Sequence, residues 1–227
     1  MDSRISCLFL TLVMALAPIM GYTADLNSLE LSNPKYSISE DGSVDIDSWR
    51  VGDSWVYATE FDVSQLIAQA NVSASLNSID GDTDVEVMDI LYIDINGTNT
   101  LVYELEYEGD FSSGNNGATL EGVSGRLEIS YDGIDIIRVR DNAVVSSEFS
   151  LGVDFYPFNI GFLRQDIADL TFNTTYESPK EHRDFPMRFG DQWYKNYEAS
   201  TDVSGSSDYF DPSEFDTVEQ ENTSWQI

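Results

Sequence analysis

The sequence predicts a mainly β protein, an antiparallel meander that forms a strongly curved sheet or open half-barrel with one short helix. From Asp84 onward apolar and polar residues alternate with a period of two, which is typical of strands with one buried and one solvated face. Turn-forming pairs such as Asn96-Gly97 and Asp141-Asn142 interrupt this alternation at short intervals. In addition, one short motif occurs twice. A two-sheet sandwich is the alternative architecture.

The repeated motif has the form Arg, apolar, Gly, Asp, any residue, Trp, and it occupies residues 50–55 and 188–193. Gly adopts positive φ angles without steric penalty, and Asp accepts hydrogen bonds from nearby backbone amides. We therefore predict that each copy is a tight turn that begins a strand. The Trp after the turn buries a large apolar area and anchors that strand.

The alternation predicts strands over about residues 55–61, 85–95, 101–107, 120–131, 134–139, 144–151, 170–176 and 193–197. Residues 109–117 are rich in Ser, Asn and Gly, so we expect a loop there. Asp132-Gly133 is expected to turn the chain between two strands. The aromatic run Phe155–Phe158 is interpreted as a corner, because Pro157 lacks the backbone N–H that a central strand position requires.

The predicted helix follows the first strand. Residues 62–65 have the form of a capping box, and the apolar residues of 63–70 fall on one helical face. These features predict a helix from Val63 to about Ala74. Alternating apolar residues at 72–76 leave a strand open as the alternative.

The charge balance is strongly acidic. The 227 residues include 41 acids and 11 Lys or Arg, for a net charge of −30. Such a surface repels nucleic acids and anionic membranes, since phosphate binding needs positive charge. An acid excess with few lysines is also typical of a chain adapted to salty water, where ions screen the self-repulsion. We interpret the acids as a solvated surface rather than as a specific cation site.

The N-terminus indicates export. A positive start, an apolar run and small residues identify 1–24 as a signal peptide, with a retained anchor as the alternative. We expect a poorly ordered lead-in at 25–47, a β domain at 48–199, and at 200–227 an acidic tail or the start of a truncated second module. The one cysteine, Cys7, lies in the signal segment, so the mature chain would have neither disulfide nor thiolate metal site. The expected location is secreted or on the cell surface.

Four Asn-x-Ser/Thr sequons are candidate glycosylation sites and agree with export. They lie at Asn71, Asn96, Asn173 and Asn222.

Asp80, Asp82 and Asp84 are candidate ligands for a structural calcium ion, because hard carboxylate oxygens suit Ca²⁺. The full EF-hand loop is absent, since Val85 and Leu91 occupy the positions of its Gly and Glu. A solvated turn that leads into a strand is the alternative interpretation. We expect no other cofactor.

Phe155, Tyr156 and Phe158 are candidate ligand-binding residues, because clustered aromatic side chains hold apolar molecules and sugars. Packing in the core is the alternative role.

Residues 184–193 resemble a turn-and-strand signature of uncharacterised secreted β-rich proteins. The broader resemblance is to half-barrel folds of the lipoprotein-carrier type, and it implies a concave apolar face. The acidic, Lys-poor, sequon-bearing composition is similar to that of cell-surface proteins of salt-adapted archaea.

We therefore expect a non-enzymatic exported surface or binding module that holds an apolar or sugar ligand on a concave sheet face. Its partners would be a lipid, a glycan or a cell-envelope protein. A purely structural envelope component is the alternative. A carboxylate-based glycosidase is a second alternative, since acids are abundant. A Ser-His-Asp relay would depend on His182, which we expect on the surface within a charged stretch.

Overall fold

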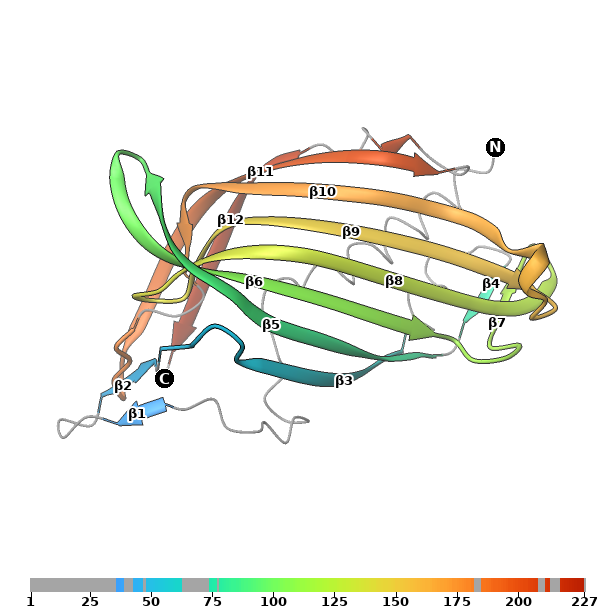
Figure 1. Ribbon diagram of the computed structural model, residues 1–227, viewed down its shortest axis with the longest axis horizontal. Coiled ribbons are helices and arrows are strands. Elements are labelled where there is room, and N and C mark those ends of the chain that lie inside the picture. The colour runs from blue at the N-terminus through green and yellow to red at the C-terminus, as the bar shows by residue number, and fades with distance from the viewer. Residues whose placement is uncertain are drawn as a thin grey trace.

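Figure 1 shows the computed structural model of the chain, and the mainly antiparallel β fold predicted above is confirmed. The structure describes residues 36–38, 43–46, 48–62, 74–76, 78–181, 185–207, 211–212 and 217–226. The predicted signal peptide, His182 and residues 63–73 of the predicted helix lie outside these ranges. Ala74, the expected end of that helix, begins a strand. Among the described residues the helical structure is limited to a 3-10 turn at Gly161–Leu163 and to Pro212, which also has 3-10 geometry.

Within the described ranges ten strands form the main sheet, and every pairing in it is antiparallel. They are β3 (Ser54–Asp62), β4 (Ala74–Leu76), β5 (Ser78–Ile95), β6 (Thr98–Ser112), β7 (Ala118–Leu120), β8 (Val123–Arg138), β9 (Ala143–Pro157), β10 (Gln165–Lys180), β11 (Gln192–Ser207) and β12 (Thr217–Gln226). The order across the sheet is β12-β11-β10-β9-β8-β6-β5-β3, and the short β7 pairs with both β4 and β8.

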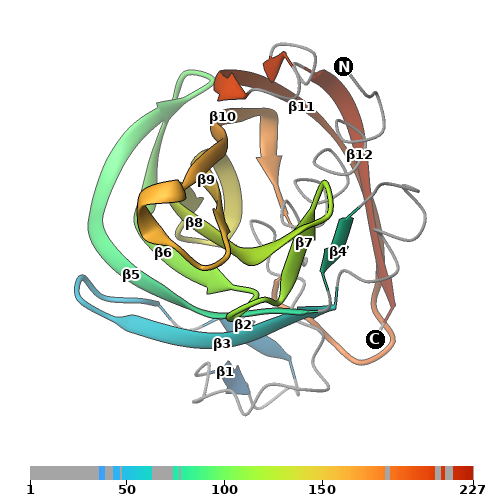
Figure 2. The same cartoon turned by 90° about the vertical axis from the view of Figure 1, so that its right-hand side faces the viewer.

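The sheet is curved and open. Figure 2, which looks along the long strands, shows the sheet curling round with β3 and β12 as its two ends. Within the described part of the chain no pairing joins these end strands, so the sheet does not close into a barrel. This arrangement confirms the curved sheet and not the two-sheet sandwich.

Two further strand pairs lie near the ends of the described chain. Within the predicted lead-in, β1 (Tyr36–Ile38) and β2 (Val44–Ile46) form a separate two-stranded antiparallel sheet. Near the C-terminus β11 continues beyond the expected end at 197 and reaches Ser207. β12 pairs along β11 from Gln192↔Gln226 to Thr201↔Thr217, so residues 217–226 belong to the main sheet.

Both copies of the repeated motif form the predicted turn. The backbone N–H of Arg50 donates to Oδ2 of Asp53 at 2.8 Å, and the N–H of Asp53 donates to the carbonyl of Arg50 at 2.9 Å. The matching distances for Arg188 and Asp191 are 2.7 and 3.0 Å. The intervening glycines have φ angles of 86° and 92°. Strands β3 and β11 each begin at the residue after the Asp.

The structure confirms one of the turns predicted from a residue pair and contradicts another. Asn96-Gly97 closes a two-residue hairpin with φ angles of 52° and 80°, as predicted. Asp132-Gly133 was expected to turn the chain, but it lies inside the continuous strand β8, so that prediction is wrong. A Cβ at residue 133 would lie 2.5 Å from Cζ of Tyr107 on β6, which shows that the glycine makes room for a ring on the neighbouring strand. Gly109, expected to open a loop, likewise lies inside β6 against the Tyr131 ring.

Candidate functional site

The two faces of the sheet differ sharply in chemistry. On β6, for example, Leu105 and Tyr107 are buried while Glu106 and Glu108 are exposed. The same alternation runs along β8 and β9. We call the buried side the inner face and the exposed side the outer face. The inner face forms the hydrophobic core, so it is the side on which a concave binding surface has to be sought.

Aromatic rings line the middle of the inner face. Phe111 stacks on Tyr131 with 5.5 Å between ring centroids. The Phe149 centroid is 5.5 Å from that of Tyr131 and 5.8 Å from that of Phe172. These contacts form an aromatic row that crosses β6, β8, β9 and β10. The centroid separations are typical of offset or tilted ring pairs.

A polar row lies beside these aromatic side chains on the inner face. Asp135 on β8 pairs with Ser147 on β9, Ser147 pairs with Thr174 on β10, and Thr174 pairs with Thr201 on β11. The Thr174 and Thr201 hydroxyls share a hydrogen bond of 2.9 Å. Asp135 is only 3% exposed and Ser147 9%, whereas both threonines are half-buried. The row therefore leads from the core toward the more accessible β11 side.

Asp135 is the least satisfied member of this row. Its Oδ1 atom is buried and has no hydrogen-bond partner in the described part of the chain. Burial raises the pKa of the Asp135 carboxyl to about 6, and a hydrogen bond from Ser147 acts in the opposite direction. A buried polar atom without a partner destabilises the fold by about 1–3 kcal/mol.

The Tyr107 hydroxyl lies beside Ser147, the cross-strand partner of Asp135, and its hydrogen bonds are weak. It is 3.5 Å from Oγ of Ser147 and donates to the carbonyl oxygen of Glu148 at 3.5 Å. Both distances are long for O–H···O hydrogen bonds. Burial raises the pKa of Tyr107, and the charge of Asp135 adds to this rise, so the phenol stays protonated at neutral pH.

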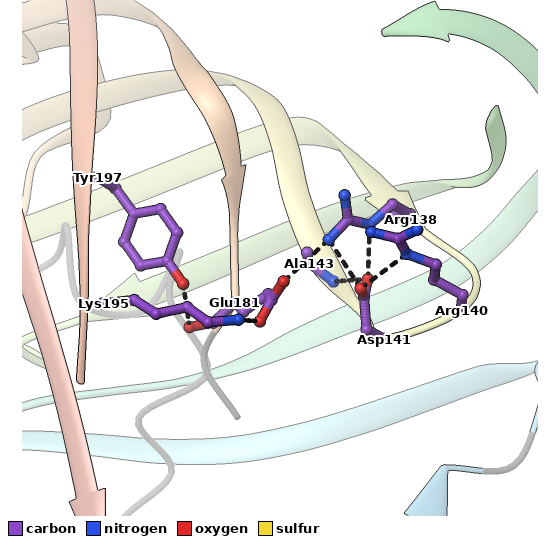
Figure 3. Close-up of polar contacts among 7 residues, drawn as sticks. All are labelled: Arg138, Arg140, Asp141, Ala143, Glu181, Lys195 and Tyr197. Atoms are coloured by element: carbon purple, nitrogen blue, oxygen red, sulfur yellow. Dashed lines mark hydrogen bonds and ion pairs between the residues drawn. The ribbon is translucent and has the colours of Figure 1, made fainter. Parts of the chain in front are cut away.

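An ionic cluster joins the turn between β8 and β9, the residue after β10, and β11 (Figure 3). Arg138 at the end of β8 donates to both carboxylate oxygens of Asp141, at 2.8 and 2.7 Å, and to Glu181 at 3.1 Å. Glu181 also pairs with Lys195 on β11 and accepts a hydrogen bond from Tyr197 through its backbone carbonyl at 3.3 Å. Because β11 is not adjacent to β8, this cluster holds two separated strands in a fixed relation. Its groups satisfy one another, which indicates a structural role.

The three predicted aromatic ligand residues do not form one cluster. Phe155 is 2% exposed and belongs to the core, as the alternative role required. Tyr156 points to the opposite face, where the Arg126 guanidinium lies 4.8 Å from its ring centroid. Phe158 lies beyond the end of β9 and is 62% exposed. Successive residues of a strand alternate between faces, so this contiguous run was divided between the two sides.

The three aspartates proposed for calcium lie on the exposed outer face of β5. Side chains two residues apart on an extended strand are separated by about 7 Å, so Asp80, Asp82 and Asp84 do not converge on one ion. Within the described ranges, no group of three or more His, Cys, Asp or Glu residues could hold a metal ion. The structure thus does not assemble the expected calcium site.

Two of the four sequons can be located with their side chains. Asn96 is exposed at the tip of the β5–β6 hairpin, and its amide donates to the carbonyl of Glu177 at 3.1 Å. Asn173 is exposed on β10. Asn222 lies in β12 without a described side chain, and Asn71 lies outside the described residues. Glycosylation at these positions stays a prediction.

Sequence reasoning did not identify Tyr107, Asp135 or Ser147. The signal for Asp135 was present, because it follows Leu127, Ile129 and Tyr131 at the spacing of inward-facing positions. An acid at such a position breaks the apolar pattern of a buried face. The expected turn at residue 132 interrupted that pattern and concealed the acid.

Comparison of the chain with protein-family models, curated proteins and solved structures gives no significant match. In the part of the chain that the structure describes, no helix combines the length and apolar character needed to cross a membrane.

Proposed function

We propose that this protein is an exported, non-enzymatic binding module that holds an apolar or sugar-bearing ligand on the inner face of its sheet. The observation that carries the proposal is the juxtaposition of the aromatic row with a polar row that ends in an unsatisfied Asp135 oxygen. Binding sites for small molecules combine a mostly apolar lining with a few placed polar groups. The half-buried Thr174 and Thr201 mark the side from which a ligand would enter.

The charge of the outer face supports an extracellular, salt-rich setting. Asp84, Glu108 and Asp132 are directly opposite one another on β5, β6 and β8, and all three are exposed. Like charges in this relation destabilise a sheet unless ions screen them. The negative charge of the outer face also repels anionic membranes and nucleic acids. The partner would therefore be a neutral lipid, a glycan or a cell-envelope protein.

Recognition fits the inner face better than glycoside hydrolysis does. A glycosidase needs two carboxyl groups that flank the scissile bond. Asp135 is flanked across the strands by Leu105 and Ser147 rather than by a second carboxylate. Its neighbours therefore suit hydrogen bonding to a bound molecule.

The experiment is a binding screen of the purified protein in high salt. Neutral lipids, alkyl glycosides and free oligosaccharides are titrated while the fluorescence of its tryptophans is recorded. Saturable binding of at least one class is expected. Absence of saturable binding across the panel, for protein shown by circular dichroism to be folded, would refute the proposal.

A structural envelope component is the second candidate function, and one observation favours it. Among the described strands, the terminal β3 and β12 each pair on one side only. The edge of a sheet can accept a strand from another chain. Sedimentation velocity over a range of protein concentrations tests this candidate. Reversible growth into large assemblies would favour it, and a monomer at all concentrations would remove it.

A further inference from the structure

Two buried polar groups on the inner face are left with unused hydrogen-bonding capacity. Asp135 Oδ1 on β8 has no hydrogen-bond partner among the residues that the structure describes. Among the described residues, the Tyr107 hydroxyl on the adjacent β6 has two hydrogen-bond contacts, both at 3.5 Å. Ser147 links the two groups, because its Oγ lies 3.5 Å from the Tyr107 hydroxyl and Ser147 is directly opposite Asp135 across the strands. One group is therefore an unpaired acceptor, and its neighbour is a donor whose contacts are long.

This combination selects a particular kind of ligand group. An ionised carboxylate only accepts hydrogen bonds, and a protonated phenol donates one. A ligand hydroxyl serves both groups, because it can donate to Asp135 while it accepts from Tyr107. A ligand carboxylate or phosphate would bring a second negative charge beside Asp135, and an ammonium group could not accept from Tyr107.

The surroundings indicate what the rest of the ligand is. Along β8, Gly133 is two residues from Asp135 and lies on the same face, so the Tyr107 and Phe149 rings opposite it are about 7 Å from the carboxyl position. Apolar surface thus begins beside the polar pair. In the other direction the Ser147, Thr174 and Thr201 hydroxyls continue the polar row across three strands. A hydroxylated head group would therefore match the polar row, and an apolar chain would match the aromatic row.

We propose that Asp135 and Tyr107 form a hydroxyl-recognition subsite, and that the ligand is a neutral amphiphile with a hydroxylated or sugar head. This inference rests on the proposed function and specifies the ligand of the same inner face. The head hydroxyl donates to Asp135 Oδ1 and accepts from the Tyr107 hydroxyl. Further head hydroxyls meet the threonines, and the apolar chain lies along the aromatic row.

The test compares three amphiphiles of equal chain length with different heads: octyl glucoside, octanoate and octylammonium. Each is titrated below its critical micelle concentration into wild-type protein in high salt, and binding is followed by isothermal calorimetry. Octyl glucoside is expected to bind about tenfold more tightly than octanoate or octylammonium, since one well-made hydrogen bond contributes about that factor.

Two variants test whether the tighter binding of octyl glucoside depends on the subsite. Asp135→Leu keeps a similar volume and removes the acceptor, and it should weaken octyl glucoside binding about tenfold without weakening octanoate binding. Tyr107→Phe keeps the ring and removes the donor, with a smaller loss in the same direction. Asp132→Asn removes a nearby outer-face charge and should change neither affinity.

The outcomes separate the two proposals. If wild-type protein binds octyl glucoside but Asp135→Leu and Tyr107→Phe bind it equally well, the subsite is refuted and the binding module stands. If octanoate binds as tightly as the glucoside, the head-group assignment fails as well. If none of the three amphiphiles binds folded wild-type protein, the inner-face ligand is refuted together with the subsite. Should Asp135→Leu not fold, the Tyr107→Phe affinity decides in the same sense.

Discussion

Tyr107 on β6 lies directly opposite Gly133 on β8, and its ring covers the space that a side chain at residue 133 would need. The adjacent pair is reciprocal: Gly109 on β6 lies opposite Tyr131 on β8, and its position is covered by that ring. Cross-strand aromatic cover of glycine is a known way to stabilise a sheet and fix its register. The two pairs place the Tyr107 hydroxyl on the inner face over Gly133, two residues from Asp135 on β8.

Gly133→Ala tests this packing. The added Cβ would lie 2.5 Å from Cζ of Tyr107 and would also meet the carbonyl of Glu148, so the strands or the ring must shift. We expect a loss of about 1–3 kcal/mol in unfolding free energy, measured by urea denaturation. Gly161→Ala is the matched control, because no atom of the described residues lies within 4 Å of its Cβ position. Its unfolding free energy should be unchanged or slightly increased, and an equal loss in both variants would contradict the packing argument.

Asp141→Asn tests the ionic cluster. Arg138 is 8% exposed and would lose its two-point contact with a carboxylate while remaining buried. Removal of one partner from a largely buried pair is expected to lower the unfolding free energy by about 2–4 kcal/mol. Arg140→Gln is the control, since Arg140 also contacts Asp141 but its side chain is 72% exposed. That change should lower the unfolding free energy by less than about 1 kcal/mol.

Stability should rise with salt because of the outer-face row Asp84, Glu108 and Asp132. Opposite side chains in a sheet are about 5 Å apart, and the Debye length falls from about 10 Å at 0.1 M salt to about 3 Å at 1 M. The midpoint of thermal unfolding is expected to increase over this range. Glu108→Gln removes the central charge and should raise the midpoint at 0.1 M salt more than at 1 M. A gain independent of salt would rule out charge repulsion as its cause.

The raised pKa of Asp135 gives stability a defined pH dependence. The carboxyl has a pKa of about 6 in the folded protein against an ordinary value of 3.8, so between these values the folded state holds a proton that the unfolded state has released. Its contribution to the unfolding free energy is therefore greatest below about pH 4 and is lost as the pH rises through 6, by about 3 kcal/mol in total.

Asp135→Asn isolates this contribution from that of the other acids. The variant cannot ionise at this position, so its unfolding free energy relative to wild type should be more favourable at pH 7.5 than at pH 4. Urea denaturation in high salt at both pH values measures the difference. A difference that does not change with pH would show that Asp135 titrates normally.

The features that sequence predicted best depend on local chemistry. The two Gly-Asp turns and the Asn96-Gly97 hairpin are specified by residues within the turn itself, and all three formed as expected. The alternation of apolar and polar residues correctly gave the two faces of the sheet. These signals were sufficient for a curved antiparallel sheet.

The candidate site could not be predicted in the same way, because it depends on pairing between distant strands. Asp132-Gly133 has the local composition of a turn, and only Tyr107 on another strand explains why the chain stays extended. With the strand broken at that point, Asp135 could not be placed on the buried face. Phe155 and Phe158 were grouped by sequence proximity, although the strand buries the first and the chain beyond it exposes the second.

The account is tested most directly by mapping the ligand on the protein by NMR. Backbone amide shifts are recorded while octyl glucoside is titrated below its critical micelle concentration. We predict saturable shifts centred on Tyr107, Asp135 and Ser147, with smaller changes at Thr174 and Thr201. Shifts confined to exposed outer-face residues such as Ile134 and Tyr194, or shifts that do not saturate, would contradict a ligand on the inner face.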